Sequence, residues 1–314
     1  MSRRELVVLG TASMVPTRRR NHNGYVLFFD DQAILFDPGE GTQRQMTHAG
    51  VSATDLTRIA LTHLHGDHSL GLAGVVQRIS GDQVPHTVPV SFPASGLGWV
   101  ENLVHASAFT HHERLVLQPL EADGVVPRLA GERGAGVRLT ARRLDHTIDT
   151  FGYRLDEPDG TSLDPVALAR HGVAGPDVGR LVREGTFTPD GGRPLSVTEV
   201  GVPRPGQSVA FVMDTRLCDA VGELADGVDL LVIESTFLHR DADQATRWGH
   251  LTCRQAAQVA ADAGVRHLVL THFSQRYSDP RELEDEAREV YDGPLTVAAD
   301  LDRVPLPRRR TTTP

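Results

Sequence analysis

The sequence predicts an α/β fold in which two β-sheets pack face to face and helices cover their outer surfaces. Two observations support this prediction. The N-terminal segment has the pattern of an antiparallel strand meander, and most of the later chain alternates between strand and helix patterns. The chain has 314 residues, of which 39% are hydrophobic, and a chain of this size can bury a full core.

The expected elements follow from the distribution of apolar residues, turn residues and helix stops. In the first half, strands are expected at 5–9, 24–29, 33–37, 59–61, 88–92, 115–117 and 137–144, and helices at 42–49, from 69 or 70 to 80, and at 99–108. In the second half, strands are expected at 209–213, 230–234, 267–271 and 295–298, and helices at 217–224, 254–263 and 280–291. Gly50 ends the first helix, and Thr252 caps the helix at 254–263.

One segment does not fit a compact domain. Residues between 155 and 208 are rich in Gly, Pro and Asp, and a structureless loop of that length is rare inside a domain. Short helices are expected within it, at 164–171 and 178–184. We therefore expect a single domain over 1–305, an inserted arm over 156–207, and a disordered Arg-rich tail over 306–314.

Composition bounds the compartment and the partners. The sequence has no terminal hydrophobic signal region and no long apolar run, so we expect a cytoplasmic protein with no membrane association. Cys218 and Cys253 provide no disulfide framework and are expected to be small core residues. The net charge of −9 argues mildly against a nucleic-acid partner, although the basic residues, all arginine, cluster at 18–20 and 308–310. His111 and His112 lack partner spacing and are expected at the surface.

Four potential metal ligands follow the expected strand at 59–61, in the run His63-Leu64-His65-Gly66-Asp67-His68. Burying these groups unpaired would cost several kcal/mol each, a cost that a metal removes. In extended backbone the i, i+2 spacing points His63 and His65 to one side, and Gly66 permits a tight turn that brings the next two ligands toward a second position. The run predicts a two-metal site; the alternative is a polar loop with unrelated histidines.

Three further strand ends carry similar residues. His146 follows the strand at 137–144, Asp214 follows 209–213, and His272 follows 267–271. A lone histidine in such a place is usually a surface residue. Because sites in layered α/β folds gather at strand ends, four such exits together indicate one site. Nitrogen and carboxylate ligands without thiolate suit zinc.

These motifs resemble those of the ribonuclease Z branch of the metallo-β-lactamase fold. The resemblance rests on HxHxDH within THLHGDHSLGL, on DHxxxxxGY at His146, on Asp-Thr at Asp214 and on THFSQRY around His272. It implies an αββα sandwich with two Zn²⁺ per subunit, Mn²⁺ or another divalent metal being the alternative. One metal would take His63, His65 and His146, the other Asp67, His68 and His272, with Asp214 bridging them. Met213 departs from the family, which usually has Gly there.

The resemblance also implies catalytic roles. Glu234 and His250 match a pair in which the histidine donates a proton to the leaving 3′-oxygen and the glutamate orients it, and Asp67 would accept a proton from the attacking water. From the sequence alone, His250 could equally be a surface residue that caps a helix.

Substrate-binding residues are expected in two places. The loop containing Arg18, Arg19, Arg20 and Asn21 resembles the family's Pro-x-Lys-x-Arg-Asn loop, with Arg18 in place of Lys; the alternative is a solvated charge run. Gly175, Pro176 and Arg180 match the Gly-Pro motif of the family's tRNA-binding arm. The family implies a homodimer in which one subunit's arm holds precursor tRNA for the other's active site.

The expected function is that of a zinc-dependent endoribonuclease that removes the 3′ trailer from precursor tRNA and leaves a 3′-hydroxyl. Two alternatives stay open. The first is a phosphodiesterase or ester hydrolase of the same fold that acts on small substrates, although such enzymes generally lack the arm. The second is a non-catalytic RNA-binding relative, which has no need for a complete set of metal ligands.

Overall fold

The computed structural model describes residues 3–110, 114–130, 132–133, 136–189 and 191–310, which form two units. The larger unit comprises the chain up to Asp156 together with Ser208–Pro307, and the smaller unit comprises Glu157–Gln207 together with the segment from Arg308. His111, His112 and residues 311–314 of the expected tail lie outside the described residues.

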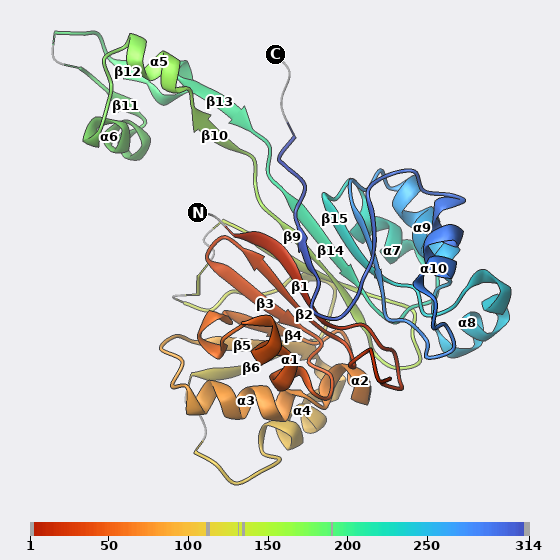
Figure 1. The fold of residues 1–314 in the computed structure, drawn as a ribbon. Coiled ribbons are helices and arrows are strands. Elements are labelled where there is room, and N and C mark those ends of the chain that lie inside the picture. Colours follow the sequence, from red (N-terminus) through yellow and green to blue (C-terminus); the bar gives the residue numbers. More distant parts are fainter. Residues whose placement is uncertain (1–2, 111–113, 131, 134–135, 190, 311–314) are drawn as a thin grey trace. The chain divides into compact units, whose positions relative to one another are not determined.

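The first sheet of the larger unit has seven strands and contains the expected N-terminal meander (Figure 1). Its order is β18 (Arg303–Pro305), β1 (Arg4–Gly10), β2 (Gly24–Phe29), β3 (Gln32–Phe36), β4 (Arg58–Ala60), β5 (Val88–Pro93) and β6 (Leu115–Leu120). Neighbours from β18 to β3 pair antiparallel, and those from β3 to β6 pair parallel. The parallel part brings the carboxyl ends of β3 and β4 to the same edge.

The second sheet also has seven strands and is parallel at one side. Its order is β17 (Leu295–Val297), β16 (Leu268–Thr271), β15 (Leu230–Glu234), β14 (Ser208–Val212), β9 (Phe151–Asp156), β8 (Arg138–Arg143) and β7 (Gly124–Val125). Strands β14 to β17 run parallel, so the ends of β14, β15 and β16 lie at one edge.

Three buried clusters make the larger unit a sandwich of sheets with helices outside. Aromatic residues fill the space between the sheets, where the Tyr25 and Phe211 rings are 5.2 Å apart. Along β1, Leu6 and Val8 face this inner core, whereas Val7 packs against the helices of the first sheet, as the two-residue period of a strand requires. The expected αββα arrangement is confirmed.

Helices cover both outer faces (Figure 1). The helices α1 (Thr42–Ala49), α3 (Leu72–Gly81) and α4 (Leu97–Val104) pack on the first sheet, and α7 (Asp219–Ala225), α9 (Cys253–Asp262) and α10 (Pro280–Arg288) pack on the second. The remaining helices of this unit are α2 (Gly66–Ser69), α8 (Ala242–Trp248) and the short 3₁₀ segments Ala53–Asp55, Ala94–Gly96 and His239–Asp241. In the part of the chain that the structure describes, no helix is long and apolar enough to span a bilayer.

Most expected elements are confirmed, although several elements differ from the expectation or were not expected. The helix expected from 69 or 70 begins at Leu72 as α3, and a separate short helix, α2, begins at Gly66, where a tight turn was expected. Strand β9 adjoins the segment rich in Gly, Pro and Asp and was not expected, although Phe151, Tyr153 and Leu155 alternate along it and are buried. Helix α8 was missed because Ala245 is its one buried residue, so it has no apolar periodicity.

The expected cap at Thr252 and the expected burial of Cys253 are confirmed. Thr252 caps α9, and its hydroxyl accepts from the Gln255 backbone N–H at 3.2 Å. Cys253 is buried as expected, and its side chain lies in the core beneath α9, whereas Cys218 is only half-buried, which corrects half of the cysteine prediction. Both are free thiols.

The smaller unit has its own core. It contains a hairpin of β10 (Gly160–Leu163) and β13 (Gly201–Arg204), a two-residue pairing of β11 (Thr186–Phe187) with β12 (Leu195–Ser196), the helices α5 (Pro165–Arg170) and α6 (Pro176–Glu184), and a 3₁₀ turn at Val197–Glu199. Leu181 and Leu195 are central to its buried cluster. Arg309 donates to the Glu157 carboxylate at 2.6 Å, which ties the C-terminal segment to this unit. Both helices expected here are present.

Candidate metal centre

All seven expected metal ligands come together at the strand ends of the two sheets, as the convergence of those ends predicts. His63 and His65 lie between β4 and α2, Asp67 and His68 lie on α2, and the remaining ligands His146, Asp214 and His272 follow β8, β14 and β16. The cluster therefore draws on both sheets.

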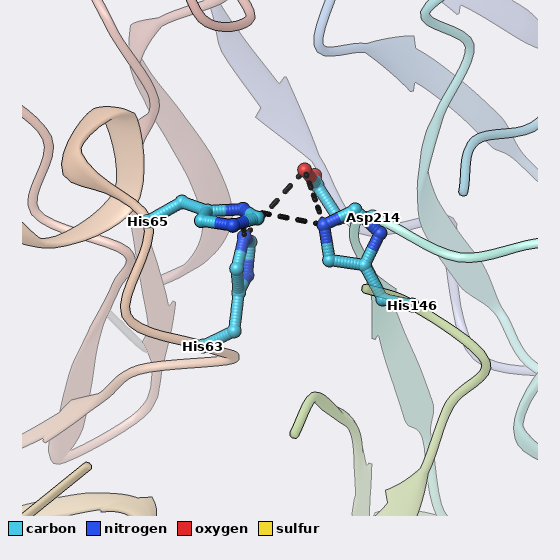
Figure 2. Close-up of side chains that lie close together, drawn as sticks. All are labelled: His63, His65, His146 and Asp214. Atoms are coloured by element: carbon cyan, nitrogen blue, oxygen red, sulfur yellow. Dashed lines mark hydrogen bonds and ion pairs between the residues drawn. The ribbon is translucent and has the colours of Figure 1, made fainter. Parts of the chain in front are cut away.

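The first group of ligand atoms is formed by His63, His65, His146 and one oxygen of Asp214 (Figure 2). His65 Nδ1 lies 3.1 Å from His63 Nε2 and 3.2 Å from His146 Nε2. Asp214 Oδ2 is 3.6 Å from His63 Nε2 and 3.7 Å from His146 Nε2. The imidazole rings thus point their nitrogens toward one common position.

The second group is formed by Asp67, His68 and His272, with the other oxygen of Asp214 beside them. His68 Nε2 and His272 Nε2 are 3.2 Å apart, and Asp67 Oδ2 lies 3.4 and 3.5 Å from them. Asp214 Oδ1 is 3.3 Å from His68 Nε2 and 3.1 Å from His272 Nε2. The two oxygens of Asp214 therefore face different groups, which is the geometry of a shared ligand.

The contacts within the cluster fit divalent cations. Among the described residues, the buried Asp214 Oδ1 has no hydrogen-bond partner, although two imidazole nitrogens are close to it. Leaving such an oxygen unsatisfied costs free energy, and a cation at each group would remove this cost. Imidazole and carboxylate ligands without thiolate match the preference of zinc.

Hydrogen bonds behind the histidines fix which nitrogen faces the centre. His68 Nδ1 donates to Asp37 Oδ2 at 2.9 Å, and His146 Nδ1 donates to the Gly249 carbonyl at 2.8 Å. The Thr236 hydroxyl donates to the Glu234 carboxylate, so its oxygen accepts from His272 Nδ1 at 2.7 Å. Since each of these contacts places the proton on Nδ1, Nε2 keeps its lone pair for a metal.

Burial affects the charge of the first group. It lowers the pKa of His63, His65 and His146, and in His63 the neighbouring His68 lowers the pKa further. A lowered pKa keeps these imidazoles neutral near pH 7. Neutral rings are the form that binds a metal.

Asp37 is a functional residue that sequence reasoning missed. Its carboxylate accepts from the Thr62 backbone N–H and from the Thr62 hydroxyl, both at 2.7 Å, in addition to His68. The available signal was its place directly after strand β3, the same placement that singled out Asp214. Asp37, Asp214 and His272 have backbone φ angles of 45°, 37° and 61°. Three residues of the centre are thus held in the left-handed region, which residues with a Cβ rarely adopt.

A half-buried His250 and a fully buried Glu234 form a pair beside the centre. His250 Nδ1 lies 3.1 Å from Glu234 Oε1, and the same oxygen accepts from the Thr215 backbone N–H at 2.8 Å. Burial opposes a charge on His250, but Glu234 and Asp214 outweigh it and raise the His250 pKa to about 9. His250 also lines a cavity of about 640 Å³, together with Asp67 and Asp214.

The structure separates the residues of the expected substrate loop. Arg18 and Arg19 are exposed, whereas the Arg20 guanidinium donates to the Tyr277 carbonyl at 3.0 Å and lies over the Phe273 ring at 4.9 Å. The backbone N–H of Asn21 donates to Asp300 at 2.6 Å, and its side-chain amide donates to the Glu40 carbonyl at 2.8 Å. Arg20 and Asn21 thus anchor the loop to the larger unit.

The expected arm residues lie at the start of α6. Gly175 has a backbone φ of 56° and precedes Pro176, the first residue of the helix. Arg180 pairs with Asp177 and Glu184 at 3.7 and 3.8 Å, so its charge is partly balanced within the helix.

Comparison with known proteins assigns the family. The chain is 58% identical to a ribonuclease Z of Streptomyces coelicolor, over 99% of this chain and 100% of that protein. It is 56% identical to a ribonuclease Z of Salinispora arenicola, over 99% and 98% of the two chains. The chain belongs to the ribonuclease Z family.

Structural neighbours agree with the fold of a ribonuclease Z family member. Human tRNase Z, short form, has a TM-score of 0.66 at 22% identity, covering 96% of this chain and 99% of that one. The metallo-β-lactamase fold protein YhfI from Bacillus subtilis has a TM-score of 0.68 at 18% identity, with the same coverage. The family model for a beta-lactamase superfamily domain matches residues 183–273, and the model for the anti-Pycsar protein Apyc1 matches residues 4–82.

Proposed function

We propose that this ribonuclease Z family member is a zinc-dependent endoribonuclease that removes the 3′ trailer from precursor tRNA and leaves a 3′-hydroxyl. The observation that carries the proposal is Asp214, whose two oxygens face two ligand groups next to the His250–Glu234 pair. Relatives named ribonuclease Z, similar over nearly their full length, support the same activity.

Each metal would be held by one ligand group. His63, His65 and His146 would hold one Zn²⁺, Asp67, His68 and His272 would hold the other, and Asp214 would be shared. When bound, a metal pair activates water and neutralises charge on a phosphodiester. The number of metals, two, is inferred from the two oxygens of Asp214, each of which faces one ligand group.

The protein's own groups would move the protons. Asp67 lines the cavity and would accept a proton from the attacking water. His250 would donate a proton to the leaving 3′-oxygen, because Glu234 occupies its Nδ1 side and leaves Nε2 for the substrate. Glu234 is fully buried and would orient the imidazole.

Substrate binding would use the exposed part of the N-terminal loop and the smaller unit. Arg18 and Arg19 are free to approach RNA phosphates, whereas Arg20 and Asn21 would position the loop. The smaller unit would act as the tRNA-binding arm through α6. We further propose a homodimer in which one arm serves the other subunit's site, and a cytoplasmic location, where precursor tRNA is available.

Cleavage of one end-labelled precursor tRNA tests the proposal. The purified protein is assayed as prepared, after chelation, and after zinc is added back, beside the His250→Ala variant. A single metal-dependent cut near the end of the tRNA body is expected, with a much slower cut by the variant. If the precursor stays intact while a small phosphodiester is hydrolysed, the protein is instead a small-substrate phosphodiesterase. If the variant binds less zinc than the wild type, its loss of activity does not identify a proton donor.

A further inference from the structure

The cavity of the metal centre carries a tryptophan that the proposed proton transfers do not use. Trp248 is the last residue of α8 and is 55% exposed, yet it lines the same cavity as His146 and His250. Single exposed apolar residues are common on protein surfaces. An exposed indole inside a candidate active-site cavity is more specific, since it offers a large flat surface to a ligand there.

The backbone fixes Trp248 relative to the metal centre. The next residue, Gly249, has a φ of 77°, and its carbonyl accepts from His146 Nδ1 at 2.8 Å. A Cβ on Gly249 would lie 2.7 Å from that nitrogen, so this close approach requires glycine. The backbone N–H of His250 donates to the Ala245 carbonyl at 2.9 Å. The backbone that carries the Trp248 indole therefore also contacts a candidate metal ligand, His146, and carries the candidate proton donor, His250.

Tethers from outside α8 reinforce this placement. The Arg216 guanidinium donates to the Thr246 carbonyl at 2.8 Å and to the Asp145 carboxylate at 3.0 Å. Since Asp145 directly precedes His146, the end of α8 and the His146 loop are connected twice, once through Arg216 and once through Gly249. The tryptophan is thus presented from a fixed helix end.

Other apolar side chains line the cavity that Trp248 lines, and arginines lie beside its aromatic rings. Met14, which is 76% exposed, and Phe237 line the same cavity. The Arg247 guanidinium lies 5.5 Å from the Trp248 ring, and that of Arg276 lies 5.5 Å from the Phe237 ring. Aromatic surfaces next to arginines are typical of sites that bind unpaired nucleotides, because bases stack on the rings and arginines meet the phosphates.

We propose that Trp248 stacks on the base of the last nucleotide of the tRNA body, the nucleotide whose 3′-oxygen is the leaving group. This inference rests on the proposed function. His250 would donate its proton to that oxygen, and Trp248, two residues earlier in the chain, lines the same cavity. Stacking requires an unpaired base, so the substrate at the cut is single-stranded. Trp248 is then a substrate-positioning residue that aligns the scissile bond with His250.

A coupling experiment tests the proposed stack. Wild type, Trp248→Ala and Trp248→Phe are compared in single-turnover cleavage of a precursor tRNA and of the same precursor with an abasic site at the last tRNA nucleotide. On the intact precursor, the alanine variant is expected to be roughly 10- to 100-fold slower, with phenylalanine restoring most of the rate. On the abasic precursor, wild type and the alanine variant are expected to agree within about twofold, because the base that the indole contacts is missing.

Controls separate stacking from structural damage. Trp99→Ala removes the other tryptophan, which is 69% exposed on α4, and should leave both rates unchanged. Zinc content and melting temperature of Trp248→Ala should equal those of the wild type. A third precursor carries the abasic site at the first trailer nucleotide and should still show the full effect of Trp248→Ala.

Two results would overturn the inference while leaving the proposed function intact. In the first, the wild type cleaves the precursor, and Trp248→Ala slows cleavage by the same factor whether or not the last tRNA base is present. In the second, the effect of Trp248→Ala on the cleavage rate disappears when the first trailer base is removed instead of the last tRNA base. A wild-type protein that leaves every precursor intact contradicts the proposed function itself, and the stacking inference with it.

Discussion

Replacement of Asp37 by Asn tests how the ligand histidines are held. Asp37 is fully buried and accepts three hydrogen bonds, one of them from His68 Nδ1 at 2.9 Å. Asparagine has nearly the same shape, and its oxygen can still accept from the Thr62 backbone N–H. Its amide nitrogen, however, would then face the His68 Nδ1–H, so two donors would oppose each other.

The conflict is relieved if the His68 proton moves to Nε2, which removes the lone pair that faces the metal position. Loss of such a supporting contact typically weakens metal affinity by about 10- to 100-fold. This corresponds to about 1.4 to 2.7 kcal/mol of binding free energy. The weakening should concern the metal held by Asp67, His68 and His272 more than the other one.

Zinc titration of the metal-free protein against a competing chelator measures this effect directly. Cleavage activity is followed in parallel as free zinc is raised, and the variant should approach wild-type activity only at higher zinc. Asp82→Asn makes the same chemical change on an exposed carboxylate at the end of α3 and is the matched control. An Asp37→Asn protein with unchanged zinc affinity at both sites would refute the role assigned to Asp37.

Three further predictions follow from the described contacts. His250→Ala should lower kcat by roughly 10²- to 10⁴-fold at unchanged zinc content, as expected for loss of a general acid, and equal rates would contradict that role. Arg19→Ala should raise KM and reduce the salt dependence of KM, because Arg19 is proposed to contact RNA phosphates. Arg20→Ala should lower the melting temperature, because Arg20 is anchored in the larger unit. If both variants changed KM and melting temperature alike, the different roles assigned to Arg19 and Arg20 would be wrong. Glu132→Ala should lower the free energy of unfolding, measured by urea denaturation, by about 3 to 5 kcal/mol. The reason is that the buried Arg58 guanidinium loses the Glu132 carboxylate, which lies 2.7 Å away. A change below about 1 kcal/mol would contradict this prediction.

The ligands could be predicted from the sequence because they depend on a local rule. His63, Asp214 and His272 each follow an apolar run, and His146 follows the more polar strand β8. Strands that run in the same direction bring their carboxyl ends to one edge. Local spacing was sufficient to find them, although it did not show that Gly66 begins a helix. The structure brings the whole set together.

Other features depend on which strands become neighbours and could not be predicted. Asp37 reaches Thr62 because β3 pairs with β4, a pairing that the sequence does not specify. Arg20 looked like its neighbours in the charge run, but it lies over Phe273, which is distant in the sequence. Trp248 ends a helix with no apolar periodicity, so no pattern marked it. Long-range contacts decide the role of each of these residues.

The left-handed backbone at Asp37, Asp214 and His272 implies that the centre is maintained at the expense of stability. A non-glycine residue in this region costs about 1 to 3 kcal/mol, and glycine would adopt the same angles without that strain. Asp214→Gly would therefore remove both an unsatisfied buried oxygen and a strained dihedral while destroying the shared ligand. The metal-free form of such a protein should melt at a higher temperature than metal-free wild type. A search for thermostable variants in the absence of metal would then favour inactive proteins, so selection for stability in this chain has to be carried out with metal present.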